Sequence, residues 1–210
     1  MSTVRIALAN IRVPTTPEES VCLATSAVAD ASRRGAVVVC FPECFVPGYR
    51  WPGTTVPSPD PAFLERAWGE VADAARAACI TVILGTERVT SRGLQTTACV
   101  INSDGSVAGW QDKGQVDPSE EAIYPALANE RRVFTAGSLT FGVVICHEGF
   151  AIQRRYGGPF VGARRSSFTH TRMSPARGPI APARSRIPPI PFTRKPCCVA
   201  LRKTHAISRP

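Results

Sequence analysis

The segment AVVVCF at residues 36–41 constrains the fold more than any other part of the sequence. It is a short, continuous run of apolar residues with three valines at its centre, which is typical of a strand. A strand that is apolar at every position is buried on both faces, as in a sheet covered by further layers. The chain is therefore expected to hold this strand at the centre of a layered fold.

The patterns around this strand alternate between strand and helix. Thr16 is a suitable N-cap for a helix that has glutamates in its first turn, arginines in its last turn and Gly35 as its stop. Further strands are predicted at 4–13 and 81–89, and amphipathic helices at 16–36 and 62–80. The order strand–helix–strand–helix–strand predicts an α/β domain.

Two predicted β-hairpins follow the third strand. The first covers residues 94–113 and turns at Asn102–Gly105, and the second covers 131–146 and turns at Ala136–Gly137. The second hairpin ends in FGVVIC, an apolar strand that finishes with a cysteine.

The net charge of +9 is very unevenly distributed. Residues 1–150 contain 12 Lys and Arg and 16 Asp and Glu, whereas residues 151–210 contain 13 basic residues, no acidic ones and nine of the 19 prolines. A basic chain normally suggests nucleic acid or an acidic membrane surface as a partner. Here the basicity belongs only to the last sixty residues. We therefore divide the chain into a globular part, 1–150, and a basic Pro/Arg-rich tail, 151–210, which we expect to be disordered.

The sequence predicts a cytoplasmic protein that does not enter the membrane. The first residues are too polar for a secretory signal peptide, and no apolar run approaches the roughly 20 residues that span a bilayer. The eight cysteines lack CxxC spacing, and most lie in apolar runs, so we expect reduced, mostly buried thiols.

Three side chains at the ends of predicted strands are candidates for chemistry. Glu43 follows the buried strand at 36–41, Lys113 ends the first hairpin, and Cys146 ends the second. In α/β sheets, sites are built at the carboxyl ends of strands. A cysteine there can be a nucleophile if a carboxylate accepts its proton, and a lysine can stabilise an oxyanion.

Each of these residues also has a simpler interpretation. Glu43 fits a surface carboxylate, Cys146 an inert buried thiol and Lys113 a solvated hairpin charge. His147 is adjacent to Cys146 but points to the opposite face if the strand continues. A zinc site is a further alternative, because cysteine and histidine are the residue types that bind zinc. Its ligands would be Cys40, Cys44, Cys146 and His147, although their spacing matches no zinc motif.

Taken together, three segments resemble the carbon–nitrogen hydrolase (nitrilase) superfamily. They are FPECFVPGY, DK…PSEEAIY and FGVVICHEG, which occur in the family's order and at comparable separations within residues 1–150. The family's motifs are a Glu after Phe-Pro, a Lys that closes a strand, and a Cys that ends an apolar strand with an acidic residue two positions later. The resemblance implies a four-layer α-β-β-α sandwich, incomplete after residue 150.

The resemblance also implies the role of each residue. Glu43 would be the general base, Cys146 the nucleophile, and Lys113 together with the backbone N–H of His147 the oxyanion donors. A second glutamate would position the base and the substrate; Glu120 and Glu121 compete for this role, and the spacing to Tyr124 favours Glu121. The implied reaction is hydrolysis of a small-molecule amide or carbamoyl substrate, less so of a nitrile, through a thioester. It needs no metal and no organic cofactor, and family members commonly form homo-oligomers.

The loss of pattern after Phe150 is best explained by a shifted reading frame. Codons that permit AIQRRYGGP at 151–159 also permit RYPETVRWA when one base is restored, which is the type of helix that the family places there. The same shift turns SSFTH into VVFHP, and residues 191–210 into SFHEKAMLCRAAENTCYFAT, which restores acidic residues. Such a tail would leave the sandwich incomplete and the activity of this chain in doubt.

A function from a different class of protein remains an alternative. If the reported frame is correct, residues 151–210 would be a disordered basic arm, and the chain would bind nucleic acid through it. We expect the hydrolase and do not expect nucleic acid as a partner.

Overall fold

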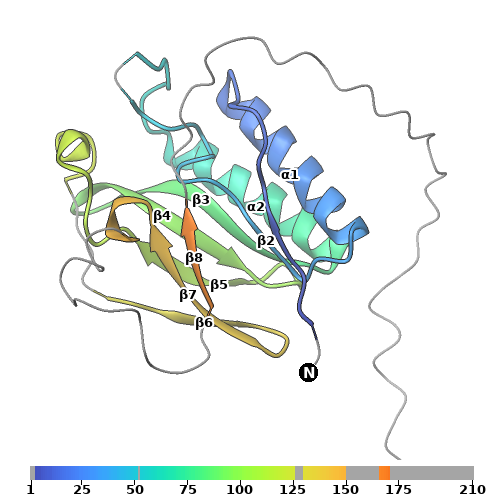
Figure 1. The fold of residues 1–210 in the computed structure, drawn as a ribbon. Coiled ribbons are helices and arrows are strands. Elements are labelled where there is room, and N and C mark those ends of the chain that lie inside the picture. The colour runs from blue at the N-terminus through green and yellow to red at the C-terminus, as the bar shows by residue number, and fades with distance from the viewer. Residues whose placement is uncertain (1–2, 52, 126–129, 150–165, 171–210) are drawn as a thin grey trace, which may run out of the picture. The chain divides into compact units, whose positions relative to one another are not determined.

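The computed structural model describes residues 3–51, 53–125, 130–149 and 166–170, all within one compact unit, Met1–Pro175. Among these residues the strands form two sheets, one with the order β1-β2-β3-β4-β5 and one with the order β6-β7-β8. Helices α1 and α2 cover one face of the larger sheet, and the smaller sheet lies on its other face (Figure 1). The described part of the chain thus has the layers α-β-β.

Helix α1 (Pro17–Arg33) begins directly after its predicted cap, Thr16, and ends two residues before the predicted stop, Gly35. The Thr16 side chain caps it by accepting a hydrogen bond from the Glu19 backbone N–H at 3.1 Å. Its glutamates lie in the first turn and Arg33 in the last, which complements the helix dipole. One stripe of the helix is buried, consisting of Ser20, Val21, Ala24, Val28 and Ala31.

Helix α2 (Pro61–Ala78) begins after Asp60, whose carboxylate accepts hydrogen bonds from the N–H groups of Ala62 and Phe63. It ends at Cys79, which has a left-handed backbone conformation with φ 51°. The buried face consists of Leu64, Ala67, Val71 and Ala75, at the helical spacing of three and four residues. This face packs, beside α1, on the larger sheet.

The larger sheet has parallel and antiparallel parts. Its strands are β1 (Ile6–Leu8), β2 (Val38–Cys40), β3 (Thr81–Thr90), β4 (Gly93–Ile101) and β5 (Val107–Asp112). The first three strands run parallel, and β3, β4 and β5 pair antiparallel. Val39 and Phe41 pack toward the helices, whereas Val38 and Cys40 pack toward the second sheet. Residues 38–41 are therefore buried on both faces, as predicted, whereas Val37 is 44% exposed.

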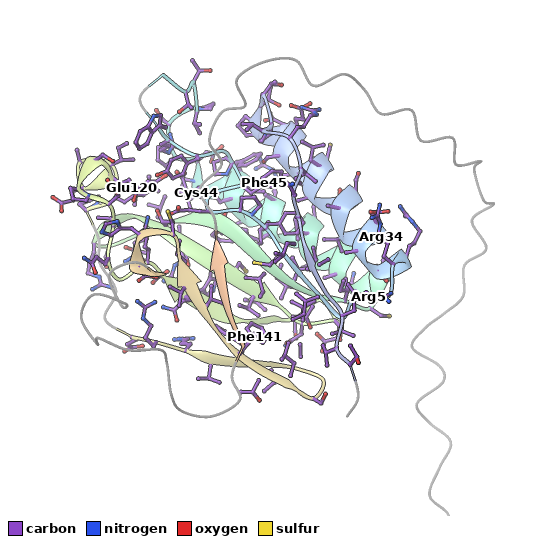
Figure 2. The ribbon with its side chains drawn as sticks, in the orientation of Figure 1. Arg5, Arg34, Cys44, Phe45, Glu120 and Phe141 are labelled. Atoms are coloured by element: carbon purple, nitrogen blue, oxygen red, sulfur yellow. The ribbon has the colours of Figure 1, made fainter. Side chains whose placement is uncertain are left out.

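The smaller sheet consists of β6 (Val133–Ala136), β7 (Leu139–Ile145) and β8 (Ser166–His170). The first two strands form an antiparallel hairpin, and β8 pairs parallel with β7. Phe134, Phe141, Val143 and Ile145 project from the hairpin into the apolar layer between the two sheets. The Phe141 ring is fully buried there (Figure 2).

The structure confirms the predicted helices, the central strand and both hairpins, and it corrects two expectations. The first strand is much shorter than 4–13, because β1 lies at the edge of its sheet and Leu8 is 72% exposed. Strand β8 is a regular element inside the segment 151–210, for which disorder was expected. The rest of that segment, with the proposed frameshift and the nucleic-acid-binding arm, lies outside the described residues.

Candidate active site

The site is built where three strands end. Glu43 follows β2, Lys113 directly follows β5 and Cys146 directly follows β7. The first two strands belong to the larger sheet and the third to the smaller one, so the site lies between segments that are distant in the sequence. The structure brings the three predicted residues together.

A close approach of two backbone segments places Glu43. The loop after β2 crosses β3 at Gly85, where an added Cβ would lie 1.9 Å from the carbonyl oxygen of Pro42. Val46 N–H then donates to the Gly85 carbonyl oxygen at 3.2 Å, which fixes the loop on the sheet. Only glycine allows this approach, because any side chain at this position would displace the backbone that carries Glu43.

Lys113 lies between two carboxylates in the protein interior. Its Nζ is 2.7 Å from Oε1 of Glu43 and 2.6 Å from Oε2 of Glu120. The exposure of the three side chains is 1%, 1% and 2%. A buried ammonium group is costly unless it is paired, and here two opposite charges compensate for its lost hydration. Among the described residues, the other oxygen of Glu43, Oε2, has no hydrogen-bond partner.

Cys146 occupies a sharp turn directly after β7. Its φ is +45°, in the left-handed region that a non-glycine residue rarely adopts, and helical residues follow from His147. Burial of the thiol, followed by the negative charge of Glu43, raises the pKa of Cys146 to about 11, against the opposing effect of Lys113. At neutral pH the group is therefore a thiol, and it needs a base to become a nucleophile.

The glutamate beside Lys113 is Glu120, not Glu121. Asp117 caps the short 3₁₀ helix Pro118–Glu120, and the Glu120 carboxylate turns back to accept a hydrogen bond from the Asp117 N–H at 3.0 Å. This capping box directs Glu120 inward, whereas Glu121 is exposed. The preference for Glu121, which rested on its spacing to Tyr124, is therefore corrected by the structure.

Tyr49 was not predicted to belong to the site, but its hydroxyl group donates a hydrogen bond to Oε1 of Glu120. The next residue, Arg50, forms a bidentate pair with the buried Glu87, at 2.7 Å and 3.0 Å. Glu87 also accepts a hydrogen bond from the Tyr124 hydroxyl group at 2.7 Å. The loop after Glu43 is thus anchored both to the site and to the interior.

His147 lies at the edge of the site. Its Nδ1 is 3.5 Å from Oδ2 of Asp117, and its side chain is 30% exposed. It borders an open pocket of about 470 Å³, into which Glu121 also projects. The pocket is lined by Gln115, Val116, Pro118, Glu121, Tyr124, Pro125 and His147. The lining thus includes His147 and Glu121, but none of Glu43, Lys113 and Cys146.

Glu148 is a further buried carboxylate, and no function was assigned to it from the sequence. It is fully buried and accepts hydrogen bonds from the backbone N–H of Gly114 and, at 2.9 Å, from that of Ile145. Arg131 binds both of its oxygens, at 2.9 Å and 2.7 Å. The acidic residue two positions after the cysteine was part of the sequence motif, but its partners come from three separate segments that the sequence alone does not join.

The described residues contain no group of three or more His, Cys, Asp or Glu side chains that could hold a metal ion. Cys40 instead faces the layer between the sheets, and Cys44 is fully buried beside Tyr124. Burial and the nearby carboxylates raise the pKa of the Cys44 thiol well above its ordinary value. The zinc site considered from ligand type is therefore not formed by these residues.

Among the helices that the structure describes, none is both long and apolar enough to cross a membrane.

Comparisons with known proteins agree on the family and the fold. The family model described as carbon-nitrogen hydrolase matches residues 4–155. No curated protein matched the chain in the comparison made. Several solved structures match, including the NitN amidase from Nesterenkonia sp. AN1, with 23% identity and a TM-score of 0.59 over 69% of this chain and 58% of that one. The chain thus spans less than two thirds of the length of this amidase.

Two further structures extend the comparison. In a mutant of the same amidase, 22% identical with a TM-score of 0.59, acrylamide has added to the active-site cysteine; the match covers 69% of this chain and 58% of that one. The glutamine-dependent NAD+ synthetase from Acinetobacter baumannii is 22% identical, with a TM-score of 0.60 over 73% of this chain and 29% of that one. These likenesses confirm the expected nitrilase-like α/β fold.

Proposed function

Because the chain belongs to the carbon–nitrogen hydrolase family, we propose that its site hydrolyses the carbon–nitrogen bond of a small amide or N-carbamoyl compound. The observation that carries the proposal is the position of Lys113, whose Nζ lies 2.7 Å from Glu43 and 2.6 Å from Glu120 beside Cys146. A thiol, a base and a cation are the groups that acyl transfer through a thioester requires.

The first half-reaction forms the thioester. Glu43 accepts the thiol proton while Sγ of Cys146 bonds to the carbonyl carbon, because the thiol is protonated at neutral pH. Lys113 and the backbone N–H of His147 stabilise the resulting oxyanion. The carbon–nitrogen bond then breaks, and Glu43 returns the proton to the leaving nitrogen, which departs as ammonia or an amine.

The second half-reaction releases the acid. Glu43 accepts a proton from water as the water oxygen attacks the thioester carbon. The carbon–sulfur bond then breaks, the acid leaves, and Glu43 returns the proton to Sγ, which restores the thiol. Glu120 also binds Lys113, at 2.6 Å, and accepts a hydrogen bond from the Tyr49 hydroxyl group. We assign Glu120 the positioning role that the sequence resemblance gave to Glu121.

The substrate class is supported by the amidase neighbours. One mutant of the Nesterenkonia amidase has acrylamide added at its active-site cysteine. A small, uncharged amide also suits the site, because Glu43 and Glu120 outnumber Lys113, and a carboxylate close to the scissile bond would be repelled.

The proposal is tested by ammonia release from acetamide and acrylamide with the purified chain. We expect turnover above the background rate, and the background rate alone for Cys146→Ala and Glu43→Gln. Cys146→Ala is the matched control, since it should still bind the amide. Turnover by Cys146→Ala would refute the thiol mechanism.

We also propose that residues 151–210 are translated out of frame and supply no catalytic group, although β8 within them pairs with β7. The loss of acidic residues and the recovery of RYPETVRWA on restoring one base support this proposal. The nucleotide sequence across the codons for Phe150 and Ala151 tests it. A single-base difference that restores the helix and a further β/α half is expected, and an intact reported frame would contradict it.

A further inference from the structure

Glu148 joins the two strand ends that carry the thiol and the lysine. Its carboxylate accepts the N–H of Ile145, the residue before Cys146, at 2.9 Å, and the N–H of Gly114, the residue after Lys113. Glu148 is itself only two residues after the cysteine. One fully buried side chain therefore spans the two sheets at the point where the site is formed.

The carboxylate is fully satisfied by this arrangement. Arg131 donates to both oxygens, at 2.9 Å and 2.7 Å, so four N–H contacts surround a group that would be very costly to bury alone. The Arg131 side chain is 45% exposed, whereas the hydrogen bond from Ile145 N–H is buried and the one from Gly114 N–H is half-buried. Because burying a charge is so costly, the backbone positions that Glu148 fixes, beside Cys146 and Lys113, are inferred to be important for the site.

We propose that Glu148 is a positioning residue that sets the separation between the Cys146 thiol and the Glu43–Lys113 pair, by tying the turn after β7 to the end of β5. This proposal rests on the proposed function. Glu148 does not touch the reacting atoms, and it acts through the backbone of Ile145 and Gly114. Without it, the strained turn at Cys146 would relax toward solvent and away from Glu43.

The test measures the rate at which iodoacetamide alkylates Cys146 in the full-length chain, as a function of pH. The tryptic peptide 133–154 contains Cys146 and no other cysteine, so mass spectrometry separates its reaction from that of the exposed Cys22 and Cys79. The groups that set the profile are Glu43, Lys113 and Glu120. Because alkylation needs no turnover, this measurement distinguishes a failure of the positioning role from a failure of the hydrolase proposal.

The first variant is Glu148→Gln. As the turn loosens, the pKa of Cys146 should fall from about 11 toward its ordinary value of 9.0. Because more of the thiol is then ionised near neutral pH, the rate of alkylation there should rise by about tenfold or more. In the hydrolase assay the same variant should lose kcat more than it raises KM. An unchanged alkylation profile with lowered thermal stability would show that Glu148 is merely structural.

The second variant, Arg131→Met, separates position from charge and covers the case in which Glu148→Gln does not fold. If Glu148 acts by position, removing Arg131 loosens the same turn and lowers the Cys146 pKa by a smaller amount. If it acts only through its electric field, losing the cation raises that pKa instead. Opposite shifts in the two variants would therefore overturn the proposal.

Glu87→Gln is the matched control. Glu87 is equally buried and is also held by an arginine, but within the described part of the chain it forms no hydrogen bond with the backbone beside Cys146 or Lys113. It should lower stability and leave the alkylation profile of Cys146 unchanged. A shift as large as that of Glu148→Gln would mean that any buried carboxylate has this effect, and the proposal would fail.

Discussion

Replacing Lys113 with methionine tests how the centre of the site is held together. The ammonium group lies 2.7 Å from Glu43 and 2.6 Å from Glu120. At an effective dielectric constant of about 20, each contact corresponds to about 6 kcal/mol of gross attraction. Much of this is offset by the lost hydration of three charges. Removing only the cation leaves two buried carboxylates facing each other, so the net loss of folding stability should be about 3–5 kcal/mol.

The loss should depend on pH in a defined direction. In Lys113→Met the folded state favours a proton shared between the two carboxylates, so it binds more protons than the unfolded state. Stability then decreases as pH rises and recovers as pH is lowered from about 7 toward about 5. Urea denaturation at both pH values measures this, and the double variant Lys113→Met/Glu120→Gln should recover part of the loss at neutral pH.

Two results would refute this reasoning. A loss below about 1 kcal/mol for Lys113→Met at neutral pH would mean that the ion pairs contribute no more than an exposed pair does. A loss that stays constant with pH would show that it arises from packing around the methionine side chain. In either case Lys113 would not be the charge that holds the two carboxylates together.

Three further changes test other parts of the structure. Gly85→Ala places a Cβ 1.9 Å from the Pro42 carbonyl oxygen, so it should cost at least about 1–3 kcal/mol in urea denaturation; an unaffected midpoint would contradict the close approach. Phe141→Ala empties a fully buried position between the sheets and should cost about 3–5 kcal/mol by the same measurement. Tyr49→Phe removes the hydroxyl group that contacts Glu120 and should lower kcat with little change in thermal stability; equal kcat would exclude this contact from the function.

Local signals made most of the fold predictable from the sequence. Thr16 and the charges around it define α1, and the unbroken apolar run at 36–41 correctly indicated burial on two faces. The short β1 was not predictable in this way, because an alternating pattern does not show that Leu8 lies at a sheet edge. Strand β8 was not expected in the reported frame, whereas the restored frame predicts a buried strand, VVFHP, at the same residues; in the structure β8 pairs with β7.

The site was predictable only where a strand end carried the signal. Glu43, Lys113 and Cys146 each follow an apolar strand, and the structure brings them together. The choice between Glu120 and Glu121 depended on which side chain a 3₁₀ turn directs inward, and spacing alone could not decide it. Glu148 was visible as part of a motif, but its contacts with Gly114 and Arg131 exist only once the sheets have packed.

The most direct test of the thiol mechanism is the mass of the tryptic peptide 133–154 after brief incubation of the chain with a small amide and rapid acid quenching. We predict that this peptide gains the mass of the acyl group in the wild-type chain, through a thioester at Cys146, and gains nothing in Glu43→Gln. Release of ammonia while the peptide stays unmodified, or acylation that persists without Glu43, would contradict the mechanism.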